Sequence, residues 1–252
     1  MSLVELKPSN QGVSRLNRMD IELLAYNQLA AYNKALLAQP GNLDIDDFAE
    51  NFLGISLDFA ELSNNGSVLG MLAFSDCVVP VYDSEQNKMR SLNVKAGTAL
   101  IDSSSIKKHE YRGRFTIAHE CAHWLLHRPT YQGQSIICRK TGTTDNIDWM
   151  EWQADNFASA LLMPAVAVHA FMKNYVSEHR ESMKMKYQML GECYARAKRE
   201  QIIRIASYTF GVSIQAAEIR LLKQKYLKPR QYRQPEPGFE CINPMTAKLF
   251  SF

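Results

Sequence analysis

The stretch His119-Glu120-Cys121-Ala122-His123 constrains this chain more than any other feature. Histidines four residues apart on a helix lie about 6 Å apart along the axis, so both rings can bind one metal ion. The glutamate that follows the first histidine points about 100° away around the axis, where it flanks the ion instead of binding it. The pattern therefore predicts a helix that carries a zinc site and a general base.

The residues around this motif predict a buried helix from Tyr111 to His127. A helix that is apolar on nearly all sides is buried. A polar stripe on such a helix needs partners, and a metal ion supplies them. The alternative is a helix whose histidines are satisfied by hydrogen bonds in the core. The apolar side chains are Phe115, Ile117, Ala118, Cys121, Ala122, Trp124, Leu125 and Leu126.

A zinc ion in a hydrolase takes three protein ligands and keeps one position for water. We expect the third ligand from a second helix, at residues 151–162, whose apolar side chains recur at helical spacing. Glu151 and Asp155 share a face of this otherwise apolar helix. We interpret Glu151 as the third ligand and Asp155 as the acceptor that fixes the tautomer of a ligand histidine. The alternative is a solvated pair of acids.

The sequence does not determine the roles of the remaining polar residues near the motif. His127 lies about 12 Å along the axis from His119, which is too far for both to bind one ion. We interpret His127 as a structural residue or as part of the wall of the site. Hydrolysis also needs a second donor to the oxyanion, and the candidates are Tyr111, Arg112, His127, Tyr131 and His169.

Three blocks of the sequence resemble the ImmA/IrrE family of metallo-endopeptidases. They are Arg114-Phe115-Thr116-Ile117-Ala118-His119-Glu120, then Glu151-x-x-Ala154-Asp155-x-Phe157-Ala158, then Leu161-Leu162-Met163-Pro164. The resemblance implies a gluzincin-like site, with His119, His123 and Glu151 as ligands of one catalytic Zn²⁺ and Glu120 as the general base. One departure is Cys121, where the family more often has a bulky or aliphatic residue.

The resemblance also implies a biological role. Members of this family typically cleave helix-turn-helix repressors and so switch on the genes that those repressors silence. The resemblance therefore implies a repressor as protein substrate, a function in transcription regulation, and a bacterial, phage or mobile-element setting.

The order of the patterns predicts an α+β fold in which residues 1–165 form a mainly helical, zincin-like metallopeptidase domain. Residues 1–17 are expected to be loosely ordered, and a helix follows at 20–37. Strands are expected at 55–59, 68–74, 77–82 and 98–101, in a small, mostly antiparallel sheet. The last of these strands is either an edge that binds an extended peptide or an internal strand.

The C-terminal part is basic. Between Lys184 and Arg233, twelve Lys and Arg minus three acids give +9, whereas the whole chain has +3. We expect residues 166–235 to form a helical, helix-turn-helix-like segment, with Gly211 at the turn and Ser213 as a helix cap, and residues 236–252 to form a tail. This segment either contacts nucleic acid phosphates or packs on the peptidase as a structural unit, and we favour packing.

Composition places further bounds on the protein. With 46% hydrophobic and 22% charged residues, the chain is typical of globular proteins. No signal pattern is seen near the N-terminus, and the most apolar stretch, residues 157–172, is too short to span a membrane. The cysteines are odd in number and scattered, which favours reduced thiols in a cytoplasmic protein; they lie at positions 77, 121, 138, 193 and 241.

We therefore expect a cytoplasmic zinc endopeptidase that acts on a repressor, with no membrane partner. One alternative is a DNA-binding or metal-sensing regulator whose zinc site is not proteolytic. Another is a hydrolase of non-peptide amides, which the same zinc site would support. The oligomeric state stays open.

Overall fold

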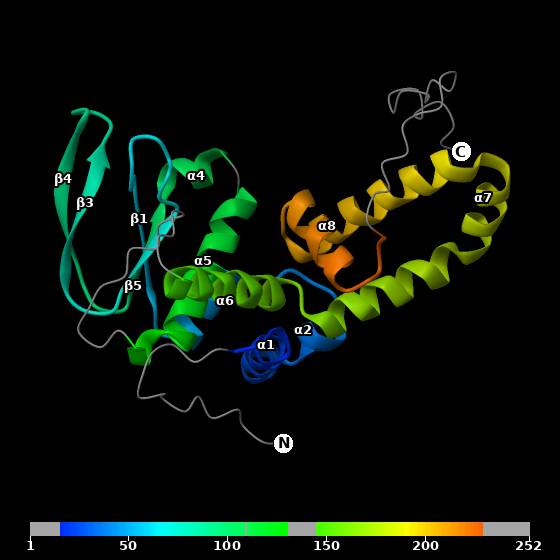
Figure 1. Ribbon diagram of the computed structural model, residues 1–252, viewed down its shortest axis with the longest axis horizontal. Coiled ribbons are helices and arrows are strands. Elements are labelled where there is room, and N and C mark those ends of the chain that lie inside the picture. The colour runs from blue at the N-terminus through cyan, green and yellow to red at the C-terminus, as the bar shows by residue number, and fades with distance from the viewer. Residues whose placement is uncertain (1–15, 109, 131–144, 229–252) are drawn as a thin grey trace.

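The computed structural model describes residues 16–108, 110–130 and 145–228. These residues form an α+β fold, as predicted (Figure 1). The helices are α1 (Arg18–Asn33), α2 (Ala35–Ala38), α3 (Ile45–Asp47), α4 (Ser103–Lys108), α5 (Glu110–Leu126), α6 (Asp145–Leu162), α7 (Ala165–Phe210) and α8 (Ile214–Lys223). The strands are β1 (Ser56–Ala60), β2 (Gly70–Ala73), β3 (Cys77–Asp83), β4 (Lys88–Val94) and β5 (Thr98–Asp102).

The strands form two small sheets. In the three-stranded sheet the order is β1-β5-β2, with β5 parallel to β1 and antiparallel to β2, while β3 and β4 form an antiparallel hairpin. Two of the three pairings are antiparallel, as expected, but the strands are divided between two sheets where one sheet was expected. The predicted strand at 98–101 is the central strand β5, so its interpretation as a peptide-binding edge is wrong and its interpretation as an internal strand is correct.

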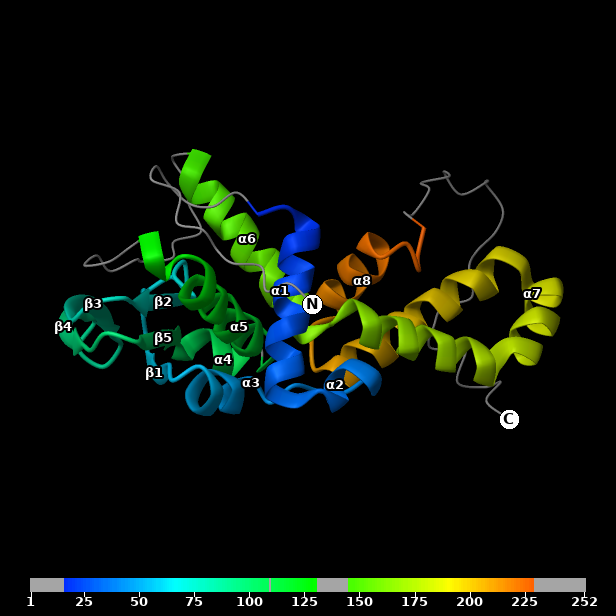
Figure 2. The same ribbon diagram turned by 90° about the horizontal axis from the view of Figure 1, so that it is seen from below.

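Side chains on β5 alternate between two cores, because successive residues of a strand face opposite sides of the sheet. Ala99 and Ile101 pack into the main core with the helices, whereas Leu100 packs into a second core with Val79 and Val81 of the hairpin. The sheet thus has helices on one face and the hairpin on the other (Figure 2). This arrangement fixes α5 firmly against the sheet.

Helix α7 doubles back on itself. Tyr175 and Gln201 would lie about 39 Å apart in a straight helix. Nevertheless, the Tyr175 hydroxyl lies 3.5 Å from the side-chain oxygen of Gln201, and the rings of Phe171 and Phe210 are 5.9 Å apart. The two arms of α7 therefore pack against each other, as Figure 1 shows.

The junction of α6 and α7 is at Pro164, which precedes the first residue of α7. In the part of the chain that the structure describes, no helix alone has the length and apolar character to cross a membrane. The segments Trp149–Leu162 and Ala165–His179 have the necessary length and apolar character only when they are taken together, and this pair is bent by 44°. Phe157, Leu161 and Val168 from this pair are fully buried in the main core.

The turn and the cap predicted near the C-terminus are present. Gly211 ends α7 in the left-handed conformation at φ 61°, and the Ser213 side chain accepts a hydrogen bond from the Ala216 amide at the start of α8. However, Ala217 and Leu221 of α8 belong to the main core. No separate helix-turn-helix unit is seen within the described residues, and both this assignment and the boundary at residue 165 stay predictions.

Candidate metal centre

Helix α5 carries the motif, and Arg114 fixes its first half. The Arg114 guanidinium donates hydrogen bonds to the carbonyl of Gly211 at 2.9 Å and to the carbonyl of Leu43 at 2.6 Å. Ile117, Ala118 and further apolar residues of α5 are buried in the main core, as the sequence predicts. The histidines therefore sit on a helix that is held on several sides.

The three predicted ligands converge. His119 Nε2 and His123 Nε2 are 3.0 Å apart, and Glu151 on α6 brings one carboxylate oxygen to 3.1 Å from His119 Nε2 and the other to 3.4 Å from His123 Nε2. Within the described residues, these three form the one group of histidine, cysteine and acidic side chains close enough to hold a metal ion.

The spacing of the donor atoms fits zinc. Two ligand atoms bound at about 2.0–2.1 Å in a tetrahedral arrangement are about 3.3 Å apart. The observed separations of 3.0, 3.1 and 3.4 Å lie within a few tenths of an ångström of that value. Two histidines and one glutamate are also a ligand set of catalytic zinc sites, which leave a fourth position for water. The group is a candidate metal site.

Asp155 contacts the outer side of His119. Its carboxylate lies 3.0 Å from His119 Nδ1, so it accepts the Nδ1 proton and leaves Nε2 free to bind a metal. Burial disfavours the charged ring, but the hydrogen bonds with Asp155 and Glu151 outweigh burial and raise the pKa of His119 to about 10. This contact between Asp155 and a ligand histidine was predicted from the sequence.

Two of the three ligand side chains, Glu151 and His123, already have the protonation state that a metal needs. Although burial opposes the charged form of Glu151, hydrogen bonds with His119 and His123 hold the pKa of this carboxyl well below its usual range. Burial, in turn, lowers the pKa of His123. An ionised carboxylate beside a neutral imidazole is the state that a divalent metal needs from its ligands.

Glu120 lies next to the centre, against the start of β2. Its side chain is buried, and a Cβ placed on Gly70 would come within 2.5 Å of Glu120 Oε1. It would also come within 2.6 Å of Thr116 Cγ2. The Glu120 carboxylate thus occupies the space that the missing side chain leaves. Gly70 was not predicted as a site residue, although a lone glycine in a strand pattern signals such a close approach.

His127 lies behind His123. Its ring is fully buried, with Nδ1 at 2.8 Å from His123 Nδ1 and Nε2 at 3.2 Å from Gln153 Oε1. Burial and the nearby His123 lower the pKa of His127 to about 3. This ring contacts His123 on the side away from the ligand atoms, which fits a structural role and gives the oxyanion role no support. Gln153 was not predicted as a site residue.

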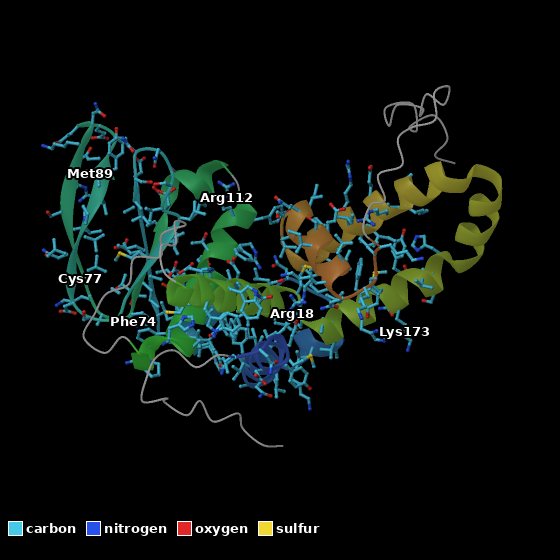
Figure 3. All side chains as sticks on the ribbon, in the orientation of Figure 1. Arg18, Phe74, Cys77, Met89, Arg112 and Lys173 are labelled. Carbon is cyan, nitrogen blue, oxygen red and sulfur yellow. The ribbon has the colours of Figure 1, made fainter. Side chains whose placement is uncertain are left out.

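The other candidate oxyanion donors do not meet at the centre through any observed contact of the described residues. Tyr111 and Arg112 are exposed at the α4 end of α5, where Figure 3 shows Arg112. His169 on α7 is hydrogen-bonded to the Tyr226 hydroxyl at 2.8 Å. Tyr131 lies outside the described residues.

Helices α5 and α6 together build the centre of a metal-dependent hydrolase. Three ligand side chains converge there beside a carboxylate, that of Glu120, which is not one of the ligands. Comparison with known families gives the particular class. Residues 104–222 match the Peptidase_M78 family, described as the IrrE N-terminal-like domain. This stretch is a domain of that family, so the chain is a metallopeptidase, as the resemblance implied. The match includes both helices of the centre and extends through α7 into α8. No curated protein matches the sequence significantly.

Proposed function

We propose that the protein is a zinc-dependent endopeptidase that cleaves a transcriptional repressor of the helix-turn-helix class. The observation that carries the catalytic part is the convergence of His119, His123 and Glu151 beside the buried Glu120. The family match supports the peptidase class. The repressor and the role in transcription regulation rest on the resemblance of the sequence blocks.

The residues divide the work of hydrolysis. His119, His123 and Glu151 would hold the ion, and zinc in such a site lowers the pKa of water and polarises a peptide carbonyl. Glu120 takes a proton from the attacking water and delivers it to the leaving amine nitrogen. Asp155 keeps His119 in the tautomer that binds.

We also propose where the substrate lies. A peptide must be extended for its carbonyl to reach the metal, and the outer strand of a sheet can bind it through main-chain hydrogen bonds. Since β5 is internal, the outer strand next to the centre is β2, whose first residue, Gly70, touches Glu120. We therefore assign peptide binding to β2.

Cytoplasmic localisation is part of the proposal. Cys77 and Cys121 are free thiols, which agrees with a reducing compartment. For the basic C-terminal segment we favour packing over nucleic acid binding. Its Arg220 is buried against Glu22 on α1, and its Arg199 pairs with Glu218 on α8.

Incubation with candidate repressors tests the proposal. We expect the zinc-loaded protein to cut a helix-turn-helix repressor at one or a few peptide bonds, seen by mass spectrometry, and a chelator to stop the reaction. Glu120→Gln removes the base but keeps the shape of the side chain, so zinc should stay bound while cleavage is lost. Cleavage of unrelated unfolded proteins only would contradict the choice of substrate.

The same variant separates the proposal from a non-proteolytic regulator. A regulator that only senses metal or binds DNA would keep its effect on gene expression in Glu120→Gln, because its zinc site would stay intact. We expect that effect to disappear. Release of small amines from non-peptide amides by the wild type, with no peptide cleavage, would instead favour the amidohydrolase alternative.

A further inference from the structure

Three side chains, one on α5, one in the turn directly after α5 and one on α6, form a continuous hydrogen-bonded row that ends at the metal site. Gln153 Oε1 lies 3.2 Å from His127 Nε2, and His127 Nδ1 lies 2.8 Å from His123 Nδ1. The far nitrogen of His123, Nε2, is the one that faces Glu151 and His119. All three side chains of the row are buried, with relative exposures of 1% for Gln153 and 0% for both histidines.

The row allows two arrangements of protons. Of two Nδ1 atoms 2.8 Å apart, one must carry the proton and the other must accept it. If His127 donates, a neutral His123 carries its proton on Nε2, where it blocks metal binding. If His123 donates, its Nε2 keeps a lone pair directed at the site, and His127 carries its own proton on Nε2.

The amide of Gln153 selects between these arrangements. An amide oxygen accepts hydrogen bonds and cannot donate. Because Oε1 is the atom that faces His127 Nε2, that nitrogen carries the proton. His127 Nδ1 is then the acceptor, and His123 must donate from Nδ1. The orientation of one amide thus determines which nitrogen of His123 is free, although Gln153 does not touch His123 in any observed contact.

We propose that His127 and Gln153 are positioning residues that fix His123 in its metal-binding tautomer. This inference rests on the proposed zinc site. The two ligand histidines then have different supports: His119 is held by the carboxylate of Asp155, whose side chain is 61% exposed, and His123 is held by a neutral imidazole and amide in the core. A buried carboxylate would carry a large desolvation cost. The neutral pair orients the ring without that cost.

Two variants of similar shape test the role of His127. Asn places its oxygen where His carries Nδ1, so His127→Asn keeps an acceptor for the His123 proton, whereas His127→Leu removes it in nearly the same volume. Loss of such a support typically weakens metal binding about 10–100-fold. We expect that loss of zinc affinity in His127→Leu, measured by chelator competition, and much less in His127→Asn. Gln153→Met should show a smaller loss.

Two further measurements separate positioning from packing. Long-range ¹⁵N NMR of the zinc-loaded protein should show His127 protonated on Nε2 and His123 on Nδ1. Thermal melts without metal should be similar for His127→Asn and His127→Leu, because the two side chains have similar shapes. A loss of zinc affinity in His127→Leu alone would then reflect the missing hydrogen-bond acceptor and not a difference in packing.

The outcomes distinguish this inference from the proposed function. Equal zinc affinity in His127→Asn and His127→Leu, or a proton on His127 Nδ1, would overturn the positioning role while wild-type zinc binding and cleavage stay intact. A wild-type protein that binds no zinc would overturn both. Normal zinc binding without any cleavage would leave the positioning role standing and remove the peptidase proposal.

Discussion

At the scale of single residues, the position of Glu120 depends on a glycine. In Gly70→Ala, the new methyl group would lie 2.5 Å from Glu120 Oε1, so the carboxylate must move. A displacement of about 1 Å at a reacting group can cost about 100-fold in rate. We expect kcat for peptide cleavage to fall about 10- to 100-fold, with zinc content unchanged by elemental analysis.

Gly41→Ala is the matched control for this prediction. The nearest atoms to a Cβ at Gly41 are 3.8 Å away, which is ordinary van der Waals contact. We expect its kcat to match the wild type. Equal activity in Gly70→Ala and Gly41→Ala would show that Glu120 does not need its present position.

The raised pKa of His119 leads to a prediction about proton release on zinc binding. Since hydrogen bonds with Asp155 and Glu151 outweigh burial and raise its pKa to about 10, the ring is protonated at pH 6.5 when no metal is bound. Zinc must displace that proton, so binding at this pH should release about one proton, and affinity should rise with pH. Calorimetry in buffers of different ionisation enthalpy measures the release.

Asp155→Asn tests the cause of this raised pKa. The amide keeps a similar shape but lacks the negative charge, so fewer protons should be released at pH 6.5. The same proton release in both proteins would mean that Asp155 does not control His119.

The residues that could be predicted are those whose spacing along one helix carries the information. His119, Glu120 and His123 follow from one motif, and Glu151 and Asp155 follow from a second helix with two acids on one face. Gly70, Gln153 and the role of His127 depend on which side chains meet after α5, α6 and β2 have packed. Those contacts cannot be deduced from the spacing of residues along the chain.

At the scale of secondary structure elements, Arg220 joins the C-terminal helices to the rest of the fold. It donates to Glu22 on α1 at 2.8 Å and to the carbonyl of Met163 at 2.9 Å. Removing one partner of a buried ion pair costs about 3–5 kcal/mol. Because Glu22 is 22% exposed, we expect Arg220→Met to lower the free energy of unfolding by only about 2–4 kcal/mol in urea titrations.

Arg204→Met provides the comparison. Arg204 lies on α7 and is exposed, and surface changes of this kind usually stay within about 0.5 kcal/mol. Similar unfolding free energies for the two variants would contradict the role assigned to Arg220.

Elements with a clear periodic pattern of apolar residues or a strong helix cap were predicted, and elements without these signals were missed. The helix of the motif, the turn at Gly211 and the cap at Ser213 are all present. Strand β4 was missed because all of its residues except Leu92 and Val94 are exposed, which leaves little apolar alternation. The pairing of β1 with β5 also escaped prediction, since these strands are far apart in the sequence.

At the scale of the whole molecule, the C-terminal helices are part of one core with the metal centre. Ala167, Phe210 and Leu221 belong to the same cluster of buried side chains as Ala118 and Ala158, which lie on the two helices of the centre. The family match likewise runs from residue 104 to residue 222. The segment is basic, but its apolar residues are the ones that pack it against the peptidase. Charge runs describe a surface and carry little information about the interior.

Zinc content in two paired variants distinguishes the ligand glutamate from the general base. We infer that Glu151 binds the ion and that Glu120, although next to a ligand in sequence, does not. After dialysis against the same zinc concentration, elemental analysis should find about one zinc per chain in the wild type and in Glu120→Gln, and far less in Glu151→Gln. Equal zinc in all three proteins, or loss of zinc in Glu120→Gln with retention in Glu151→Gln, would contradict these roles of the two glutamates.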